Sequence, residues 1–259
     1  MDYSSMNAKA INTYLDTLEI DALEKEMPIL KSSARSTVLK LVTKYNNRIE
    51  KHYRELERIK QLYRFEEQLY RQGLQYIAGV DEAGRGPLAG SVFAAAVILK
   101  PGTIIKGIND SKKLSEAKRE EIFKEIIEKA EYYNVASVTG EEIDEINIRN
   151  AAFKAMGKAV QGLDILPQFV LIDGDDVKEM NIQHQCIVKG DSLSISIAAA
   201  SILAKVSRDR YIREYDKIYP QYGFASHKGY GTKEHIDSIK KFGLCPIHRR
   251  SFTSKFINV

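Results

Sequence analysis

The stretch YIAGVDEAGRGPLAGSVFAAAVIL, residues 76–99, places two apolar runs on either side of a polar, glycine-rich segment. The runs YIAGV (76–80) and SVFAAAVIL (91–99) have the length and composition of buried strands, and the short connection predicts that they pair. An acidic pair, Asp81 and Glu82, follows the first run directly. We therefore expect a sheet edge that carries carboxylates beside a glycine loop.

The chain after this stretch alternates between strand-like and helix-like segments. Further strands are expected at NVASVT (134–139) and FVLI (169–172), the clearest buried strand of the chain. Helices are expected between and after them, near residues 116–133, 149–162, 194–219 and 232–242. Strands joined early by short connections and then by helices indicate a mixed, partly antiparallel sheet flanked by helices.

The N-terminal region has a different composition. It contains one proline, Pro28, and no glycine before Gly73, which favours helix throughout, with a longer helix from about Ser36. No set of potentially catalytic side chains stands out there. We expect a helical accessory region over residues 1–72, followed by the main domain over residues 73–259.

Length and composition exclude several classes of protein. A chain of 259 residues with 44% hydrophobic residues can bury a core without disulfides. Cys186 and Cys245 lie far apart, without neighbours at zinc-finger spacing, so two reduced thiols are expected. The N-terminus has no apolar leader, and the longest apolar runs are too short to span a bilayer. The sequence predicts a soluble cytoplasmic protein with no membrane partner.

The net charge of +4 is mild, but the basic residues are clustered. From Arg35 to Arg64 there are nine Lys or Arg residues against three Glu. The second cluster comprises Lys228, Lys233, Lys240, Lys241, Arg249, Arg250 and Lys255. Such clusters could track the phosphates of a nucleic acid, or they could simply be solvated helix faces. Charge alone leaves both interpretations open.

Two further acids occupy positions like that of the first pair. Asp173 follows the strand FVLI directly, and Asp191 in KGDS precedes a long helix. Taken alone, each acid suits a structural role, such as a helix N-cap for Asp191. Four carboxylates together suit hard divalent cations, and two such ions can stabilise the attacking and the leaving oxygen in phosphodiester cleavage.

The segment DEAGRGPLAG (81–90) is the most specific signal. Gly84 and Gly86 flank Arg85, and glycine lets a backbone approach a sugar or a phosphate closely. A dinucleotide fingerprint does not fit, because the glycine spacing is wrong and acids precede the loop. A phosphate-binding P-loop is excluded because the Gly-Lys-Ser/Thr ending is missing. A tight turn with a surface arginine stays open on physical grounds.

Several motifs together resemble the ribonuclease HII family. They are GVDEAGRGPLAG, NDSKKLS (109–115), LIDG (171–174), KGDS (189–192), AAASILAKVSRDR (198–210), YPQYGFASHKGYGT (219–232) and HRRSF (248–252), in the family's order and spacing. The resemblance covers roughly residues 73–259. It implies a ribonuclease H-like fold with an N-terminal helical extension, which some bacterial members have. Type HII rather than HIII is indicated, because HIII carries threonine in place of Arg85 and glutamate in place of Asp191.

The resemblance also implies roles for individual residues. The metal-binding and catalytic carboxylates would be Asp81, Glu82, Asp173 and Asp191, holding two Mn²⁺ or Mg²⁺ ions, with Asp81 bridging them. Gly84, Arg85 and Gly86 correspond to the loop that senses the 2'-hydroxyl of a ribonucleotide. Tyr230 corresponds to the tyrosine that stacks on the sugar of the next deoxynucleotide, and Lys112 to a phosphate contact.

The implied activity is metal-dependent cleavage of RNA paired with DNA. The substrates would be RNA/DNA hybrids and DNA duplexes that contain single ribonucleotides, cut on the 5' side by a monomer. A structure-selective DNA nuclease or integrase of the same fold would use similar carboxylates and would also cut all-DNA duplexes. A protein that only binds hybrids is disfavoured because all four acids are present.

Three other polar residues invite a catalytic reading. Asp209 lies between two arginines on a predicted helix and is interpreted as a paired surface or helix-packing charge. His227 is expected to shape or contact the substrate face, and His248 to begin the C-terminal basic cluster. None of the three is expected to bind metal.

Overall fold

The computed structural model describes residue 3, residues 5–174 and residues 180–256. Contacts divide the chain into two compact units, Met1–Lys60 and Gln61–Val259. The division lies earlier in the chain than the change in composition at Gly73, because the segment after Lys60 packs within the second unit. Over the described ranges, no helix is long and apolar enough to cross a membrane.

The first unit is built from α1 (Ala8–Thr17), α2 (Ile20–Lys31) and most of α3 (Ser36–Leu62). Asn7 begins α1, since its side chain accepts a hydrogen bond from the N–H of Ala10 at 2.8 Å. Apolar side chains from all three helices form its core: Ile11, Leu15, Leu23, Met27, Leu30, Val38, Val42 and Tyr45. The prediction of an N-terminal helical extension is confirmed.

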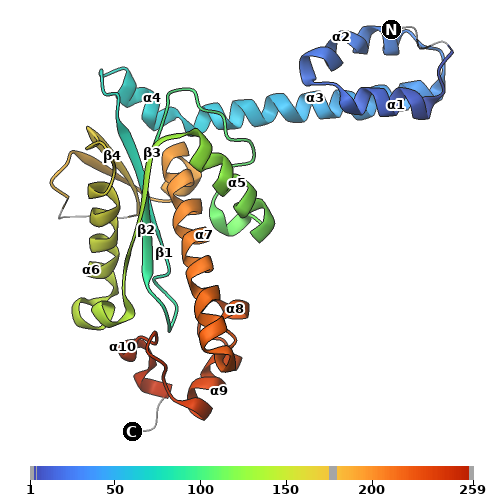
Figure 1. Cartoon of the computed structure of the whole chain (residues 1–259). Coiled ribbons are helices and arrows are strands. Elements are labelled where there is room, and N and C mark those ends of the chain that lie inside the picture. Colours follow the sequence, from blue (N-terminus) through green and yellow to red (C-terminus); the bar gives the residue numbers. More distant parts are fainter. Residues whose placement is uncertain (1–2, 4, 175–179, 257–259) are drawn as a thin grey trace. The chain divides into compact units, whose positions relative to one another are not determined.

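The second unit contains a five-stranded sheet of order β3-β2-β1-β4-β5 (Figure 1). The strands are β1 (Ile77–Ala83), β2 (Val92–Leu99), β3 (Ala130–Val138), β4 (Phe169–Asp173) and β5 (His184–Ile187). β1 pairs antiparallel with β2, and β2 with β3, whereas β4 runs parallel to both β1 and β5. The predicted mixed sheet of a ribonuclease H-like fold is confirmed.

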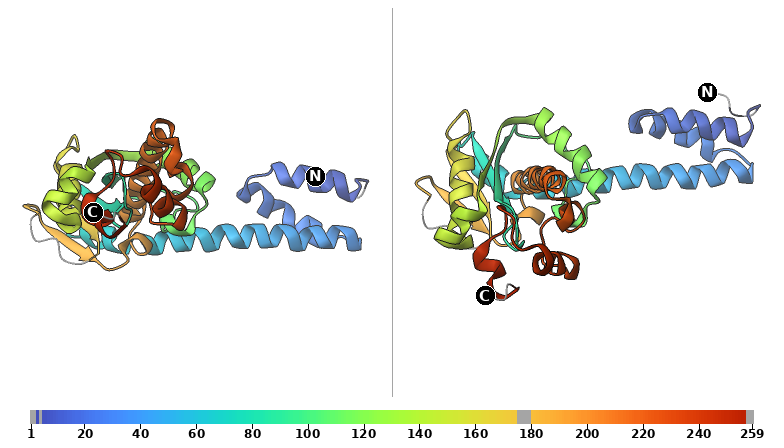
Figure 2. Two further views of the ribbon diagram at one scale, coloured as in Figure 1. Left: turned by 90° about the horizontal axis from the view of Figure 1, so that it is seen from below. Right: turned by 60° about the horizontal axis from the view of Figure 1, so that its bottom comes forward.

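Helices cover both faces of this sheet (Figures 1 and 2). α6 (Gly140–Gln161) packs on one face, and α7 (Ile195–Ile218) packs on the other, with α5 (Glu116–Lys129) beside it. α7 approaches β1 closely because Gly79 has no side chain. A Cβ at this position would lie 2.1 Å from the carbonyl carbon of Ser196.

Short elements complete the second unit. They are α4 (Arg64–Tyr70), η1 (Ser111–Lys113), η2 (Gly190–Ser192), η3 (Pro220–Tyr222), α8 (Phe224–His227), α9 (Lys233–Phe242), α10 (Arg250–Thr253) and η4 (Ser254–Phe256). Glu66 anchors α4 to the first turn of α7. Its buried Oε1 accepts hydrogen bonds from Ser194 Oγ at 2.5 Å and from the N–H of Ser196 at 3.1 Å.

Three details differ from the sequence predictions. The helix expected to reach Tyr133 ends at Lys129, because Tyr132 and Tyr133 pair with β2 as strand residues. β1 continues to Ala83, so the acidic pair lies inside the strand rather than after it. The short strand β5 was not predicted, since its four residues HQCI show no clear apolar run.

Candidate active site

The ends of β1 and β4 bring Asp81 and Asp173 side by side. The parallel register aligns Val80 with Ile172, so each aspartate occupies the next position on its strand. Adjacent strands lie about 4.8 Å apart. Alternation along β1 puts the Asp81 side chain on the same face as Gly79, the face that α7 covers. The sheet itself therefore positions two of the four predicted carboxylates.

Asp191 reaches this edge on the turn η2. The N–H of Gly190 donates a hydrogen bond to Asp173 Oδ1 at 2.6 Å, which ties the turn to the end of β4. A Cβ on Gly190 would lie 2.6 Å from Cδ1 of Ile197 and 3.3 Å from Cβ of Ile187, so the turn packs closely against these two side chains. Asp191 is buried, and its Oδ1 accepts a hydrogen bond from Ser192 Oγ at 3.3 Å. The third carboxylate is thus held directly beside the second.

Burial and mutual repulsion disfavour the charged forms of these acids. Burial, then the charges of Glu82 and Asp173, raises the pKa of Asp81 well above its usual value. Burial also raises the pKa of Glu82, although Arg85 Nη1 lies 3.3 Å from its Oε1. Burial and the charge of Asp173 raise the pKa of Asp191. Such a cluster of negative charge favours the binding of cations.

The four carboxylates fit divalent metal ions by donor type and by charge. All are oxygen donors, which suit Mg²⁺ and Mn²⁺. Among the described residues, no three His, Cys, Asp or Glu side chains already form a group that could hold a metal ion. The fit of the four carboxylates to such ions therefore rests on the type of donor atom and on charge.

Gly84 and Gly86 are glycines for different reasons. Gly84 has φ of +100°, and a Cβ there would lie 2.1 Å from Nε of the buried Arg208 beneath the loop. A Cβ on Gly86 would meet only Cε1 of Tyr230, at an ordinary 3.6 Å. Gly84 therefore allows the loop to pack against Arg208, whereas Gly86 leaves the loop backbone without a side chain where it lies next to Tyr230.

Tyr230 presents a half-exposed ring beside this loop. Its side chain retains 45% exposure, and the guanidinium carbon of Arg208 lies 5.9 Å from the ring centroid. Its backbone is held on both sides: its N–H donates to the carbonyl of His227 at 2.9 Å, and its own carbonyl accepts from the N–H of Thr232 at 2.8 Å. A ring fixed in this way can meet a flat surface of a ligand.

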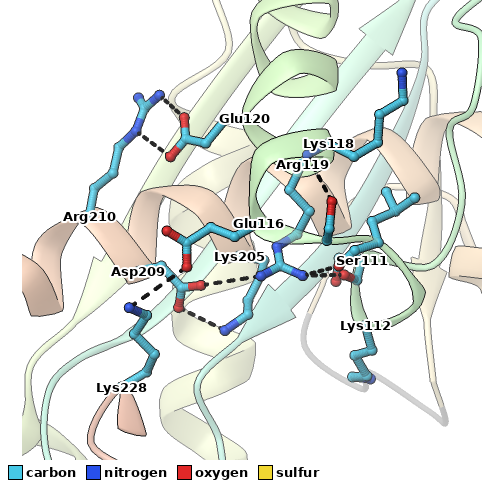
Figure 3. Close-up of polar contacts among 12 residues, drawn as sticks. Ser111, Lys112, Glu116, Lys118, Arg119, Glu120, Lys205, Asp209, Arg210 and Lys228 are labelled. Carbon is cyan, nitrogen blue, oxygen red and sulfur yellow. Dashed lines mark hydrogen bonds and ion pairs between the residues drawn. The ribbon is translucent and has the colours of Figure 1, made fainter. Parts of the chain in front are cut away.

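Lys112, on η1, lies within the electrostatic field of the acids. Burial lowers its pKa, but the charges of Asp81, Asp110 and Asp191 outweigh burial and raise it. In Figure 3 its side chain points away from the ion pairs between α5 and α7. Lys112 therefore places a positive charge near the carboxylates, and its expected contact with a phosphate stays a prediction.

Asp209 belongs to the ion-pair network between α5 and α7 (Figure 3). Its carboxylate lies 2.7 Å from Lys205 Nζ and 4.0 Å from Arg119 Nη2. The neighbouring Arg210 pairs instead with Glu120 of α5. The interpretation of Asp209 as a paired helix charge agrees with these contacts, but the residue is buried rather than on the surface.

Three buried histidines lie near Tyr230: His227, His235 and His248. His248 Nδ1 accepts a hydrogen bond from the N–H of Cys245 at 2.9 Å, so its proton must lie on Nε2. That Nε2 faces Nε2 of His235 at 3.0 Å, and His235 Nδ1 donates to the Tyr230 carbonyl at 2.9 Å. His227 Nδ1 accepts the N–H of Gly229 at 3.2 Å.

The expected C-terminal basic cluster needs correction. His248 does not begin it, because the ring is buried and its pKa falls to about 4, mainly through burial. Arg249 is also fully buried. These residues pack inward because Arg249 donates to backbone carbonyls of a distant loop and His248 contacts the ring of His235, and sequence composition reveals neither contact. His227 shapes the loop before Tyr230, as expected.

We expect the fold to lose stability as the pH falls below about 6.5. Burial lowers the pKa of His235 and His248 to about 4 in the folded chain, so between these values the unfolded chain binds more protons. Their stabilising contribution is complete above the unfolded pKa and is lost as pH falls toward 4. Thermal unfolding from about pH 7 to 5 should show a declining midpoint. His235→Asn should flatten this decline and His52→Gln should not; equal slopes in all three proteins would refute the assignment.

Comparisons with known proteins agree with this geometry. Two family models match the chain: Ribonuclease HII over residues 78–255 and Ribonuclease HII N-terminal domain over residues 8–70. Ribonuclease HII of Ruminiclostridium cellulolyticum is 56% identical over 84% of this chain and 86% of the relative. That of Acetivibrio thermocellus is 49% identical over 98% and 99%. The crystal structure of ribonuclease H2 from Pyrococcus horikoshii OT3 matches with a TM-score of 0.60 and 30% identity, covering 70% of this chain and 96% of that one.

Proposed function

Because the chain belongs to the ribonuclease HII family, and so to the endoribonucleases that act on RNA in RNA/DNA hybrids, we propose that it also cuts DNA duplexes at single embedded ribonucleotides. The bond cut would be the phosphodiester 5' to the ribonucleotide, leaving a 3'-hydroxyl and a 5'-phosphate. Such cleavage would begin the removal of ribonucleotides from DNA. The proposal keeps the cytoplasmic monomer that the sequence analysis expects.

The observation that supports this proposal is the position of the carboxylates. Asp81 and Asp173 follow aligned positions of two parallel strands, and the bond from Gly190 to Asp173 sets Asp191 beside them. Glu82 adds a fourth carboxylate next to Asp81. We infer that Asp81, Glu82, Asp173 and Asp191 hold two divalent ions. When bound, such ions supply activation of water and stabilisation of the leaving 3' oxygen.

Substrate recognition is proposed to occur between the glycine loop and Tyr230. The backbone at Gly86 lies within contact distance of the Tyr230 ring, so a ribose whose 2'-hydroxyl meets the loop backbone would have the ring next to it. The exposed ring would then stack on the following deoxyribose. Lys112, held charged by the nearby acids, would contact a phosphate close to the reacting bond.

A labelled DNA duplex with one ribonucleotide tests the proposal. Incubation with Mg²⁺, Mn²⁺ or a chelator, followed by mapping of both product ends, should show a single cut 5' to the ribonucleotide that the chelator prevents. An all-DNA duplex of the same sequence is the control. Comparable cutting of this control would support a DNA nuclease and contradict the proposal.

Tyr230→Phe is expected to retain much of the activity, whereas Tyr230→Ala should lose considerably more. Phenylalanine keeps the stacking surface and the contact with Arg208, and alanine removes both. Base and sugar stacking on an aromatic ring is worth about 1–3 kcal/mol, so the alanine variant should be roughly 10-fold to 100-fold slower. Initial rates on the single-ribonucleotide duplex measure this difference. Equal losses would assign the role to the hydroxyl or remove it from Tyr230.

Removing residues 1–60 is expected to weaken substrate binding only modestly. A contact of this unit with phosphates would use the basic cluster from Arg35 to Arg64, but several of its side chains in α3 already have partners within their unit. Arg48 donates to the carbonyls of Leu15 and Leu18, and Lys44 pairs with Asp16. The exposed lysines of this helix, Lys40, Lys51 and Lys60, would shift the salt slope of binding by about three at most.

The matched control for this deletion removes residues 1–70. It also takes away Glu66, which leaves Ser194 and the N–H of Ser196 without their buried acceptor. The longer deletion should therefore lower the unfolding temperature, and the shorter one should not. Binding isotherms at several salt concentrations report the slope. An unchanged slope after removal of residues 1–60 would assign the unit to protein contacts instead.

A further inference from the structure

The segment Cys245–Arg249 connects the two loops that flank the proposed substrate site. Its backbone pairs with the loop that follows Gly86: the N–H of Arg249 donates to the carbonyl of Leu88, and the N–H of Gly90 donates to that of Ile247, both at 2.8 Å. The N–H of Leu88 in turn donates to the carbonyl of Gly229, beside Tyr230, at 2.8 Å. The glycine loop and the tyrosine loop are thus joined through one short segment.

The side chain of Arg249 holds the glycine loop from inside. It is fully buried, and its guanidinium donates to four loop carbonyls: those of Gly84 at 2.6 Å, Pro87 at 2.9 Å, Gly90 at 2.9 Å and Arg85 at 3.0 Å. Within the described part of the chain, no ion pair involves this arginine. The hydrogen bonds of its guanidinium therefore hold the shape of one loop rather than pairing with a carboxylate.

These bonds decide which way the loop's amide groups point. In a planar trans peptide the C=O and the following N–H point in opposite directions. Because the carbonyls of Gly84 and Arg85 face Arg249, the N–H groups of Arg85 and Gly86 face away from it. The N–H of Leu88 follows this rule, since it lies opposite the Pro87 carbonyl and reaches the neighbouring loop.

His248 acts on the other loop through His235. Its Nε2–H donates to His235 Nε2 at 3.0 Å, and His235 Nδ1–H donates to the carbonyl of Tyr230 at 2.9 Å. This series of hydrogen bonds begins at the N–H of Cys245, which fixes the tautomer of His248. The same five-residue segment therefore fixes both loops. Arg249 holds the glycine loop, and His248 holds the backbone of Tyr230 through His235.

We propose that Cys245–Arg249 is a clamp that positions the ribonucleotide-recognition surface, with Arg249 and His248 as its positioning residues. The proposal rests on the proposed function of the site. Arg249 directs the amides of the glycine loop toward the ribose, and His248 sets the distance of Tyr230 from them. An arginine is required, because its planar fork offers five donors, whereas a lysine ammonium offers three from a single atom.

Arg249→Lys in the full-length chain tests the first half of the clamp. We expect kcat on the single-ribonucleotide duplex to fall roughly 10²-fold, the cost of misplacing a recognition group by about 1 Å. The affinity for an all-DNA duplex should not change, since the positive charge and the exposed surface remain. Arg250→Lys, at the exposed neighbouring arginine, is the matched control and should behave as wild type.

His248→Gln tests the second half, in the wild-type and the Tyr230→Ala backgrounds. If His248 acts by placing the tyrosine, its substitution should slow the wild type but cost little once the ring is gone. A role in general stability would slow both backgrounds equally. This cycle also decides the matter if Arg249→Lys does not fold, because additive effects overturn the clamp.

The outcomes separate the clamp from the proposed function. If the wild type fails to cut 5' to the ribonucleotide, the proposed function is wrong. If the wild type cuts there and Arg249→Lys keeps its kcat, the clamp alone is wrong. A loss of unfolding temperature with unchanged kcat would likewise reduce Arg249 to a structural residue and overturn the proposal.

Discussion

Asp81→Asn and Asp173→Asn are each expected to abolish turnover while the protein stays folded. Asparagine keeps the size of the side chain but removes the negative charge that cations require. A fall in kcat of roughly 10³-fold or more would correspond to about 4 kcal/mol of lost transition-state stabilisation. Binding to an RNA/DNA hybrid should persist, because the loop and Tyr230 are untouched.

The unfolding temperature gives a second, independent test of the same variants. Burial and neighbouring charges raise the pKa of Asp81 in the folded chain, so its charged form opposes folding at neutral pH. Asp81→Asn should therefore unfold at the same or a higher temperature. Asp209→Asn is the matched control: it breaks the pair with Lys205, so it should lower the unfolding temperature and largely retain kcat. Near-normal turnover in either active-site variant would show that the metal site lies elsewhere.

The parts of the structure that could be predicted are those that a local sequence pattern indicates. Apolar runs such as FVLI have the length of buried strands, and an acid directly after such a run must lie at the edge of the sheet. The parallel register of β1 and β4 then aligns Asp81 with Asp173 without any information from side chains. The N-terminal helices were predictable in the same way, because glycine is absent from that segment.

The unpredicted parts depend on contacts between distant positions. Arg249 was assigned to the C-terminal basic cluster and His248 to its beginning, because Lys240, Lys241, Arg250 and Lys255 lie nearby in the sequence. Arg249 instead contacts backbone carbonyls of the distant glycine loop, and His248 contacts the ring of His235 and the N–H of Cys245; no local pattern identifies these contacts. Gly84 illustrates the same limit: its need for glycine comes from Arg208 packed beneath the loop, in addition to its positive φ.

The two loop glycines should therefore fail in different ways when each is replaced by alanine. Gly84→Ala forces a Cβ against Arg208 at a φ of +100°, so it should lower the unfolding temperature as well as the cleavage rate. Gly86→Ala leaves the fold intact, because its Cβ meets Tyr230 at an ordinary 3.6 Å, but it adds a methyl group to the loop surface proposed to meet the ribose. We expect it to slow cleavage roughly 10²-fold at an unchanged unfolding temperature.

The largest effect should appear in the substrate rather than in the protein. Replacing the single 2'-hydroxyl by hydrogen leaves the polar groups that would bind it unpaired, and sites of that kind reject the deficient analogue by roughly 10⁴-fold or more. Cleavage rates are compared on duplexes with no ribonucleotide, one ribonucleotide and a run of several. The wild type should cut the duplexes that contain one ribonucleotide or several. It should cut the duplex without a ribonucleotide roughly 10⁴-fold more slowly, or slower still.

Gly86→Ala should lower the ratio of the cleavage rate on the single-ribonucleotide duplex to the rate on the all-DNA duplex. Steric exclusion should slow cleavage of the first duplex and leave the second rate unchanged. Gly157→Ala in α6, where a new Cβ meets nothing within 4 Å, is the matched control and should leave both rates unchanged. An enzyme that needs a run of ribonucleotides would not sense a single junction. A Gly86→Ala variant with a wild-type ratio would place the 2'-hydroxyl contact outside the loop, because an added methyl group at the contact would have to disturb it.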